Sequence, residues 1–233
     1  MTEGPGGWQT ATVTDVRHET ANAKTFRLAL PAPSRHLAGQ HYIVRLSAPD
    51  GYTASRSYSV ATPPDGSSEI ELTVERLEDG EVSSFLHDVV VPGDKLEVRG
   101  PIGGWFVWRG ETPALLVGGG SGVVPLMAML RLARRSGRSE LLSLVVSARS
   151  ATDLYYAEEL PGPETTIVFT RSTPPSWPRP PGRLNHDDFA GLATDTAAYV
   201  CGSPGFADAT TSLLTDSGLS ASNIRVERFG PTQ

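Results

Sequence analysis

The first hundred residues alternate between apolar and polar positions, the pattern of strands that turn one face to a core. The alternation is clearest in residues 25–30 and 69–75, and turns rich in Pro, Gly and Asp separate such segments. The segments expected to form strands are 8–16, 25–30, 42–46, 55–61, 69–75 and 95–98, with a short helix at 83–89. Closely spaced strands of this kind predict a small antiparallel β-barrel.

The second half of the chain changes period. Residues 114–117 form an apolar run without alternation, as expected of a parallel strand buried on both faces. Further strands are expected at 141–146, 166–170, 197–200 and 224–229, and helices at 126–135, 154–160 and 206–216. Strands that alternate with helices predict a doubly wound parallel sheet, so the fold class is β + α/β. The pattern changes near residues 107–112, which divides the chain into domains 1–108 and 109–233.

Composition narrows the classes of function. The 233 residues are 39% hydrophobic, and no apolar run approaches the ~20 residues of a membrane span. A net charge of −6 argues against nucleic acid as a partner. The single cysteine excludes a disulfide framework and a chain-borne iron–sulfur cluster with four thiolates, and it fits a reducing, cytoplasmic location. The amino terminus has no signal-peptide pattern, and the five histidines show no metal-ligand spacing, so no metal site is expected.

A glycine-rich turn, residues 118–122, stands between an expected strand and an expected helix. Glycines allow the backbone to approach a pyrophosphate, and a helix amino terminus offers free N–H groups. The turn is not a standard dinucleotide fingerprint, because Val123 and Pro125 occupy the third glycine position in its two possible registers. Val123 also excludes the hydrolase nucleophile elbow around Ser121. An ordinary tight strand-to-helix turn is the alternative.

Two further segments hold candidate residues. In Arg56-Ser57-Tyr58-Ser59, strand alternation places Arg56 and Tyr58 on one face. An arginine fork can bind phosphate, and an aromatic ring can lie against an isoalloxazine. The alternative is a paired surface arginine beside a packed tyrosine. Cys201 ends an expected strand, where it could also be a buried small apolar residue; no partner base is evident, so a covalent nucleophile is not expected.

Five motifs in order carry a family resemblance: Arg56-x-Tyr58-Ser59, Gly80-Glu81-Val82-Ser83-Ser84, Gly100-Pro101-Ile102-Gly103, Gly120-x-Gly122-x-x-Pro125 and Cys201-Gly202-x-Pro204. In this order the chain resembles the ferredoxin–NADP reductase superfamily, in particular stand-alone bacterial ferredoxin or flavodoxin reductases and oxygenase reductases. The resemblance implies a flavin-binding barrel followed by a nicotinamide-nucleotide domain. FAD is the expected flavin, rather than FMN.

The resemblance implies a role for each matching residue. Arg56 would bind a flavin phosphate, Tyr58 would stack on the isoalloxazine, and Ser59 would hydrogen-bond near flavin N5. Cys201 and Gly202 would place the nicotinamide over the flavin, so Tyr58, Ser59 and Cys201 are the candidate catalytic residues. The other candidates are Ser57; Thr73, Val74 and Glu75 along the flavin edge; Gly80, Val82, Ser83 and Ser84 at the flavin pyrophosphate; and Gly119, Gly120, Ser121 and Gly122 beneath the nucleotide pyrophosphate.

Three arginines bear on the choice of nucleotide. Arg149 and Arg171 follow expected strands, and Arg183 comes after a proline-rich segment, residues 174–181. A 2′-phosphate favours arginine forks, so NADPH is expected rather than NADH. The alternative is that all three are solvated loop arginines, and the proline-rich segment could also carry Arg183 elsewhere.

The expected reaction is hydride transfer from NADPH to FAD, then single-electron transfer to a separate acceptor. We expect that acceptor to be a small acidic carrier such as a ferredoxin, serving an oxygenase or another redox enzyme, with no fused iron–sulfur domain in this chain. Its docking site could be the basic cluster Arg131, Arg134, Arg135 and Arg138, which could equally be a solvated helix face. The alternatives are a ferric-chelate or free-flavin reductase, and an electron-transfer subunit without turnover of its own.

Overall fold

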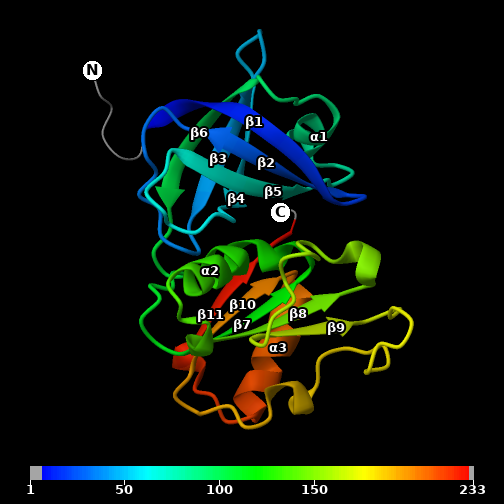
Figure 1. Ribbon diagram of the computed structural model, residues 1–233. Helices are drawn as coiled ribbons and strands as arrows, with labels where there is room; N and C mark the ends of the chain where they lie inside the picture. The colour runs from blue at the N-terminus through cyan, green and yellow to red at the C-terminus, as the bar shows by residue number, and fades with distance from the viewer. Residues whose placement is uncertain (1–6, 231–233) are drawn as a thin grey trace.

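The computed structural model describes residues 7–230, which form an antiparallel sheet and a parallel sheet, one above the other (Figure 1). Residues 1–6 and 231–233, where the two expected domains begin and end, lie outside the described residues. The antiparallel sheet has six strands in the order β4-β3-β6-β1-β2-β5. These strands are β1 (Trp8–Thr20), β2 (Ala23–Ala29), β3 (His41–Ser47), β4 (Thr53–Ser59), β5 (Glu69–Glu75) and β6 (Lys95–Ile102), and helix α1 (Glu81–Asp88) follows β5.

The antiparallel sheet curls into a barrel that stays open along one seam. Its edge strands are β4 and β5, and within residues 7–230 the one bridge between them joins Val60 to Leu72. The apolar positions of the alternating strands fill the inside, with Phe26, Leu28 and Tyr42 among the buried side chains. The predicted barrel is therefore confirmed, and its open seam leaves room for a ligand beside β4 and β5.

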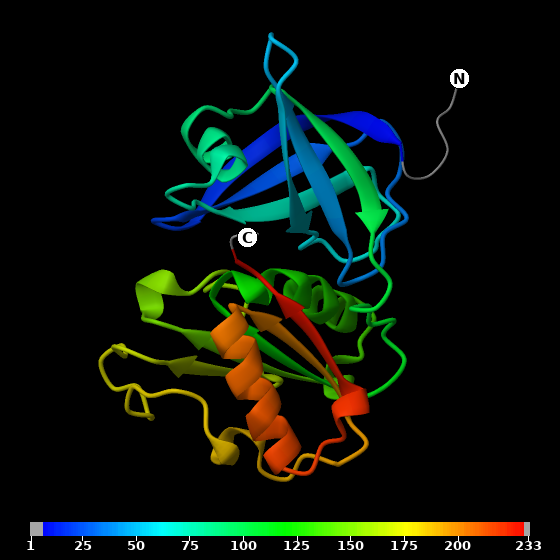
Figure 2. The same cartoon turned by 180° about the vertical axis from the view of Figure 1, so that it is seen from behind.

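The parallel sheet has five strands in the order β11-β10-β7-β8-β9. They are β7 (Ala114–Gly119), β8 (Leu142–Ala148), β9 (Thr165–Phe169), β10 (Ala197–Gly202) and β11 (Ile224–Arg228). Helix α2 (Val123–Arg135) lies between this sheet and the barrel, and α3 (Pro204–Asp216) covers the opposite face (Figures 1 and 2). Apolar side chains of β7 are buried toward both helices, Leu116 on one face and Val117 on the other. This double burial explains the apolar runs, and the predicted doubly wound sheet is confirmed.

One predicted helix is wrong. Residues 154–160 form turns after a short 3-10 helix (Ala151–Asp153), not an α-helix. Tyr156 has φ +52°, in the left-handed region that an α-helix cannot contain. Both Tyr155 and Tyr156 are buried, and Tyr156 is bonded to the barrel, so tertiary contacts override the local helical spacing. The other 3-10 helices are Gly120–Gly122, Ser139–Leu141, His186–Phe189 and Ala221–Asn223.

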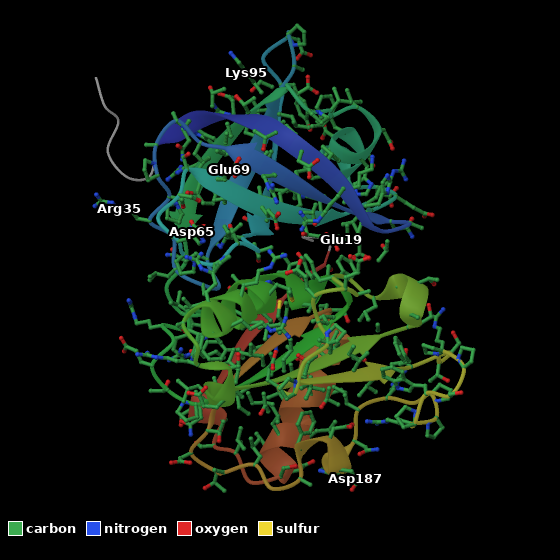
Figure 3. All side chains as sticks on the ribbon, viewed as in Figure 1. Glu19, Arg35, Asp65, Glu69, Lys95 and Asp187 are labelled. Carbon is green, nitrogen blue, oxygen red and sulfur yellow. The ribbon has the colours of Figure 1, made fainter. Side chains whose placement is uncertain are left out.

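Labelled side chains mark the two ends of the molecule and the region between its sheets (Figure 3). Lys95 lies at the outer end of the barrel and Asp187 at the outer end of the parallel-sheet unit, whereas Glu19 lies between the two. Among the helices within residues 7–230, none is both long and apolar enough to cross a membrane.

Candidate functional site

A cavity of about 2000 Å³ runs between the barrel and the parallel sheet. Its barrel wall follows the open seam and includes Arg56, Tyr58 and Thr73. Its other wall is formed at the carboxyl ends of the parallel strands, the usual ligand site of such sheets, and includes Gly120 and Arg171. A second cavity, about 610 Å³, lies beside β9 and contains no residue that the sequence singled out as a candidate. The larger cavity is therefore the candidate functional site.

The cavity brings together most of the residues predicted from the sequence, but not all. Those on its wall are Arg56, Ser57, Tyr58, Ser59, Thr73, Glu75, Gly80, Ser83, Gly119, Gly120, Ser121, Arg149, Arg171 and Arg183. The predicted residues that do not line it are Val74, Val82, Ser84, Gly122, Cys201 and Gly202. The side chains of Val74 and Val82 pack in the barrel core, so only their backbone could contact a ligand.

Strand β4 positions the Arg56–Ser59 motif at the seam. Antiparallel pairing sets Arg56 opposite Val44 and Tyr58 opposite Tyr42, so the two side chains share a face as expected. The Arg56 guanidinium donates only to the neighbouring Ser55 carbonyl among the described residues, and the residue is exposed. Its remaining N–H donors face the cavity side of the strand, where an anion could bind.

The Tyr58 hydroxyl is buried and has no hydrogen-bond partner within residues 7–230. Burial raises the pKa of Tyr58, against the opposing effect of the Arg56 charge. A buried hydroxyl without a partner is costly, by about 1–3 kcal/mol. The ring lies on the wall of the cavity, so it offers a ligand an aromatic surface, while the protein itself covers the hydroxyl.

Helix α1 begins beside the cavity without a side-chain cap. Gly80 is its N-cap, and a Cβ there would lie 2.3 Å from Ser83 Oγ, so glycine is required for this close turn. Ser83 Oγ donates to the Gly80 carbonyl and accepts from the Leu77 N–H, rather than bonding the free N–H groups of the first turn. These N–H groups, together with the helix dipole, suit a phosphate.

The glycine-rich turn links β7 to α2 on the opposite wall. Gly120 has φ +56°, which favours glycine, and α2 also begins without a side-chain cap. A Cβ on Gly122 would lie 2.1 Å from the Cys201 carbonyl oxygen, so this turn and the end of β10 pack backbone against backbone. The same contact places Cys201 behind the turn, where it is fully buried, rather than on the wall. Burial raises the pKa of the Cys201 thiol, and the charge of the nearby Glu227 adds a smaller effect in the same direction.

Glu227 is a cavity residue that the sequence did not single out. Its strand, β11, pairs with β10 so that Glu227 lies opposite Cys201, and its side chain reaches the cavity wall. Burial raises the pKa of Glu227 to about 7. Alternation in residues 224–229 indicated only a closing strand, and no motif pointed to this carboxyl. Phe206, Tyr155 and Phe229 also line the cavity without having been predicted.

The three arginines expected at the nucleotide lie together at the ends of β8 and β9. The Arg171 N–H donates to the Arg149 carbonyl (2.9 Å), and the Gly182 N–H donates to the Phe169 carbonyl (2.9 Å). The second bond returns the proline-rich loop to the end of β9, so the loop leaves Arg183 on the cavity wall. All three are exposed, and no ion pair involves them within residues 7–230.

The basic cluster, on α2 and just after it, divides into two covered and two exposed arginines. Arg131 is largely buried and pairs with Glu71 and Glu159, and Arg134 pairs with Glu164. Arg135 pairs with Asp65 at 3.4 Å, and Arg138 donates to the Gly110 carbonyl at 2.7 Å. Arg131 and Arg134 are covered by their partners, which contradicts a solvated face there, whereas Arg135 and Arg138 are exposed as that interpretation expects. Docking of a carrier on this cluster stays a prediction.

Comparison with known proteins agrees with the fold. The family described as "Oxidoreductase FAD-binding domain" matches residues 10–107, and "Oxidoreductase NAD-binding domain" matches residues 116–212. "Ferredoxin--NADP reductase B" of Sorangium cellulosum is 31% identical, across 93% of this chain and 91% of that protein. The chain belongs to the ferredoxin–NADP reductase superfamily. It is thus an oxidoreductase with FAD and a pyridine nucleotide as its cofactors.

Three other similarities extend this result. The ferredoxin–NAD(P)⁺ reductase component of the naphthalene 1,2-dioxygenase system of Pseudomonas putida is 29% identical over 94% of this chain. The chain spans 68% of that protein, and 61% of the phenol 2-monooxygenase reductase component of Pseudomonas sp.. The flavohem-like FAD/NAD-binding domain of nitric oxide dioxygenase from Vibrio cholerae has the same fold, with a TM-score of 0.85, 24% identity, and coverage of 97% of this chain and 100% of that one.

The residues present fit these cofactors. The Tyr58 ring, the exposed guanidinium of Arg56 and the start of α1, which has no side-chain cap, provide an aromatic surface, a cation and N–H donors along one wall. The glycine-rich turn provides a second uncapped helix start on the other wall. A ligand with a planar ring and two phosphates can use each of these groups.

Proposed function

We propose that this oxidoreductase takes hydride from NADPH in preference to NADH and delivers single electrons to a separate acidic carrier, such as a ferredoxin that serves an oxygenase. The observation that carries the proposal is the single cavity shared by the two sheets, with a flavin-type wall and a nucleotide-type wall facing each other. Bound flavin would supply the ability to accept two electrons together and release them one at a time.

On the barrel wall, Arg56 binds a flavin phosphate and the Tyr58 ring lies against the isoalloxazine. Ser59 hydrogen-bonds near N5, and Ser57, Thr73, Val74 and Glu75 border the ring edge. The first turn of α1, from Gly80 through Val82, Ser83 and Ser84, binds the pyrophosphate through its N–H groups. The place of Tyr58 on the cavity wall and the missing side-chain cap of α1 support these roles.

On the opposite wall, Gly119, Gly120, Ser121 and Gly122 bind the nucleotide pyrophosphate, and Cys201 and Gly202 set the height of the nicotinamide. The absence of a side chain at Gly122 allows this turn to touch the Cys201 backbone, which fixes the two segments relative to each other. Glu227, opposite Cys201, lies at the wall where a proton could be held near the ring. Its pKa of about 7 allows either protonation state near neutrality.

Arg149, Arg171 and Arg183 provide the preference for NADPH. Three exposed arginines line the cavity, none with an ion-pair partner within residues 7–230, and a 2′-phosphate would neutralise part of this charge. The oxygenase systems named for the relatives support a ferredoxin or an oxygenase component as the acceptor.

We also propose that residues 1–108 form the flavin domain and residues 109–233 the nucleotide domain. The stretch between β6 and β7 contains the boundary. A cytoplasmic location is proposed because the one cysteine is buried and unpaired, as in proteins of reducing compartments.

An anaerobic visible spectrum of the purified protein, titrated with NADPH and separately with NADH, tests the proposal. We expect a yellow protein that bleaches with both nucleotides and faster with NADPH, and that then reduces an added ferredoxin. A colourless protein that does not bind added FAD contradicts it. A protein that reduces chelated iron or free flavin but not ferredoxin is a small-molecule reductase. A protein that bleaches only when a co-purifying partner is present is an electron-transfer subunit.

A further inference from the structure

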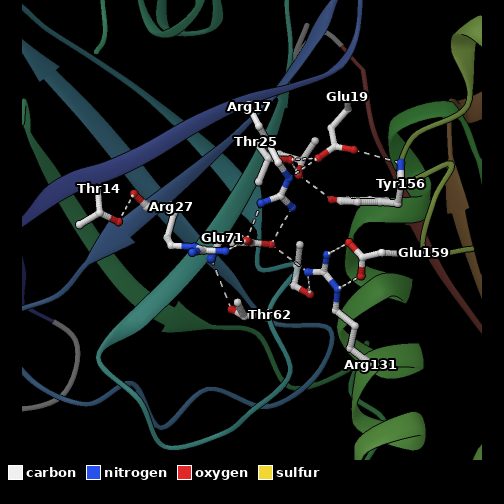
Figure 4. A network of polar contacts seen from close by, with 12 residues as sticks. Thr14, Arg17, Glu19, Thr25, Arg27, Thr62, Glu71, Arg131, Tyr156 and Glu159 are labelled. Carbon is white, nitrogen blue, oxygen red and sulfur yellow. Dashed lines mark hydrogen bonds and ion pairs between the residues drawn. The ribbon is translucent and has the colours of Figure 1, made fainter. Parts of the chain in front are cut away.

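A buried polar network joins the barrel to the parallel-sheet unit (Figure 4). At its centre is Glu71 of β5, whose side chain is 5% exposed. Its carboxylate accepts from Arg17 of β1 (2.6 and 3.0 Å), from Arg27 of β2 (3.0 Å) and from Arg131 of α2 (2.9 Å). Burial alone would raise the pKa of Glu71, but the bonds and charges of Arg17 and Arg131 lower it to about 2.

Arg131 makes the connection between the two sheets. Its side chain, 14% exposed, reaches the barrel through Glu71 and through the Ala61 carbonyl (2.9 Å). The same guanidinium donates to both carboxylate oxygens of Glu159 (2.8 and 2.5 Å), on the loop after β8. One planar group therefore spans the barrel, helix α2 and this loop, and only arginine has the fork of donors to do so.

Tyr156 forms the second half of the network. Its N–H donates to Glu19 Oε2 of β1 (3.0 Å), and its hydroxyl lies 2.5 Å from Thr73 Oγ1 of β5. The Arg131 guanidinium stands over its ring, 5.3 Å from the ring centre. These barrel contacts hold Tyr156 at φ +52°, a conformation that a bulky residue adopts only when its surroundings require it.

The network ends at the walls of the cavity. Thr73, which bonds Tyr156, lines the barrel wall, and Tyr155, next to Tyr156, lines the same cavity. Arg131 lies on the helix whose first turn follows the glycine-rich turn, so a shift of α2 would move that turn as well. The network thus connects Thr73, on the barrel wall, with Tyr156, whose neighbour Tyr155 also lines the cavity.

We propose that the Glu71–Arg131–Tyr156 network clamps the two sheets together and sets the spacing between the flavin-type wall and the nucleotide-type wall. Arg131 is a positioning residue in this proposal, which rests on the proposed function for its kinetic consequences. Buried charge networks often contribute a defined geometry rather than net stability, and this one is fully paired. Its task is to keep the hydride donor and acceptor at reacting distance once both are bound.

The test compares Arg131→Met with Arg135→Met in the flavin-loaded protein. Methionine keeps the apolar stem and removes the fork. Arg135, on the same helix, is 54% exposed, and its one ion pair to the barrel, with Asp65 at 3.4 Å, is a surface contact that is expected to contribute little. In Arg131→Met we expect normal flavin content, a nearly unchanged KM for NADPH, and flavin bleaching in stopped flow that is about tenfold to a hundredfold slower, as a displacement near 1 Å produces. Arg135→Met is expected to match the wild type in all three measurements.

Two readouts separate a clamp from a general loss of structure. The long-wavelength absorbance of stacked nicotinamide and flavin should weaken in Arg131→Met, and Arg131→Lys should recover only part of it. Amide hydrogen exchange should increase in residues 154–160 and in β5, and remain unchanged in β3 and β6, two barrel strands without a residue of the network. If Arg131→Met does not fold, Glu159→Gln takes its place. Glu159 is at the 43% exposed end of the network, so a smaller effect of the same kind is expected.

Wild-type bleaching rates and wild-type exchange in Arg131→Met, or in Glu159→Gln if that is the variant that folds, would overturn the clamp. If the wild type does not react with either nucleotide, the proposed function fails. Hydrogen exchange still decides on the clamp in that case, because opening of the contact between the sheets does not depend on turnover.

Discussion

The carboxyl group of Glu227 should make the protein less stable as the pH rises through neutrality. Glu227 has a pKa of about 7 in the folded protein because burial at the cavity wall disfavours the charged form, against an ordinary value of 4.5. Below pH 4.5 the group is protonated in both the folded and the unfolded state. Between pH 4.5 and 7 the unfolded chain loses this proton before the folded protein does, so the free energy of unfolding falls. Above pH 7 both states are ionised and the loss is complete.

The size of the effect follows from the difference between the two pKa values. A difference of about 2.5 pH units corresponds to roughly 3 kcal/mol, at about 1.4 kcal/mol per unit. Glu227 lies on a cavity wall that solvent can reach, which reduces the penalty of the charged form. We therefore expect the stability to fall by about 1–2 kcal/mol between pH 5 and pH 8.

Urea unfolding of the wild type and of Glu227→Gln, at several pH values from 4.5 to 8, measures this difference. Flavin-depleted protein is used so that cofactor binding does not add its own pH dependence. Glutamine stays neutral, so the variant should become more stable relative to the wild type as the pH rises, and Glu111→Gln, at an exposed position, should not. Parallel stability curves for the wild type and Glu227→Gln would refute the assignment of a buried, reluctantly ionised carboxyl.

Three further predictions concern the walls of the cavity. Gly122→Ala would place a Cβ 2.1 Å from the Cys201 carbonyl oxygen, so it should cost about 1–3 kcal/mol in thermal unfolding and weaken nucleotide binding, whereas Gly104→Ala, with open space around it, should do neither. Tyr58→Ala should lose flavin on gel filtration, and full retention with normal turnover would remove Tyr58 from the site. Arg171→Ala should raise the KM for NADPH by about tenfold, the value of one charge-assisted hydrogen bond, and leave that for NADH nearly unchanged; equal effects would argue against a 2′-phosphate contact.

The parts of the fold that the sequence predicted correctly depend on residues close together in the chain. Alternation within six or seven residues is enough to define β2 and β5, and an apolar run followed by glycines is enough to define β7 and the turn after it. The order of the motifs then indicated the family, which the comparisons confirm. These signals are local because the alternation of side chains along a strand and the conformation of a turn depend on neighbouring residues, whereas the partner of each strand does not.

The polar face of β5 shows where local patterns are insufficient. Alternation correctly assigned Ile70, Leu72 and Val74 to the core, and the opposite face, with Glu71 and Thr73, would ordinarily face solvent. In the structure Glu71 and Thr73 are buried as well, because the parallel-sheet unit covers that face. The same covering makes Arg131 a buried partner rather than a surface charge.

The helix wrongly predicted at residues 154–160 has the same cause. Its partners are distant in sequence: Tyr156 bonds Glu19 across 137 positions, and Arg131 bonds Glu71 across 60. A pattern confined to one segment cannot show that a second sheet will cover it. What the sequence does contain is a strand with a glutamate on its polar face and, in the other half of the chain, a helix that follows the glycine-rich turn and carries an arginine. In a protein that must bring two cofactors together, such opposite charges on the two halves are candidates for the contact that holds the halves in position. The Arg131 variants test whether this pair of charges has that role.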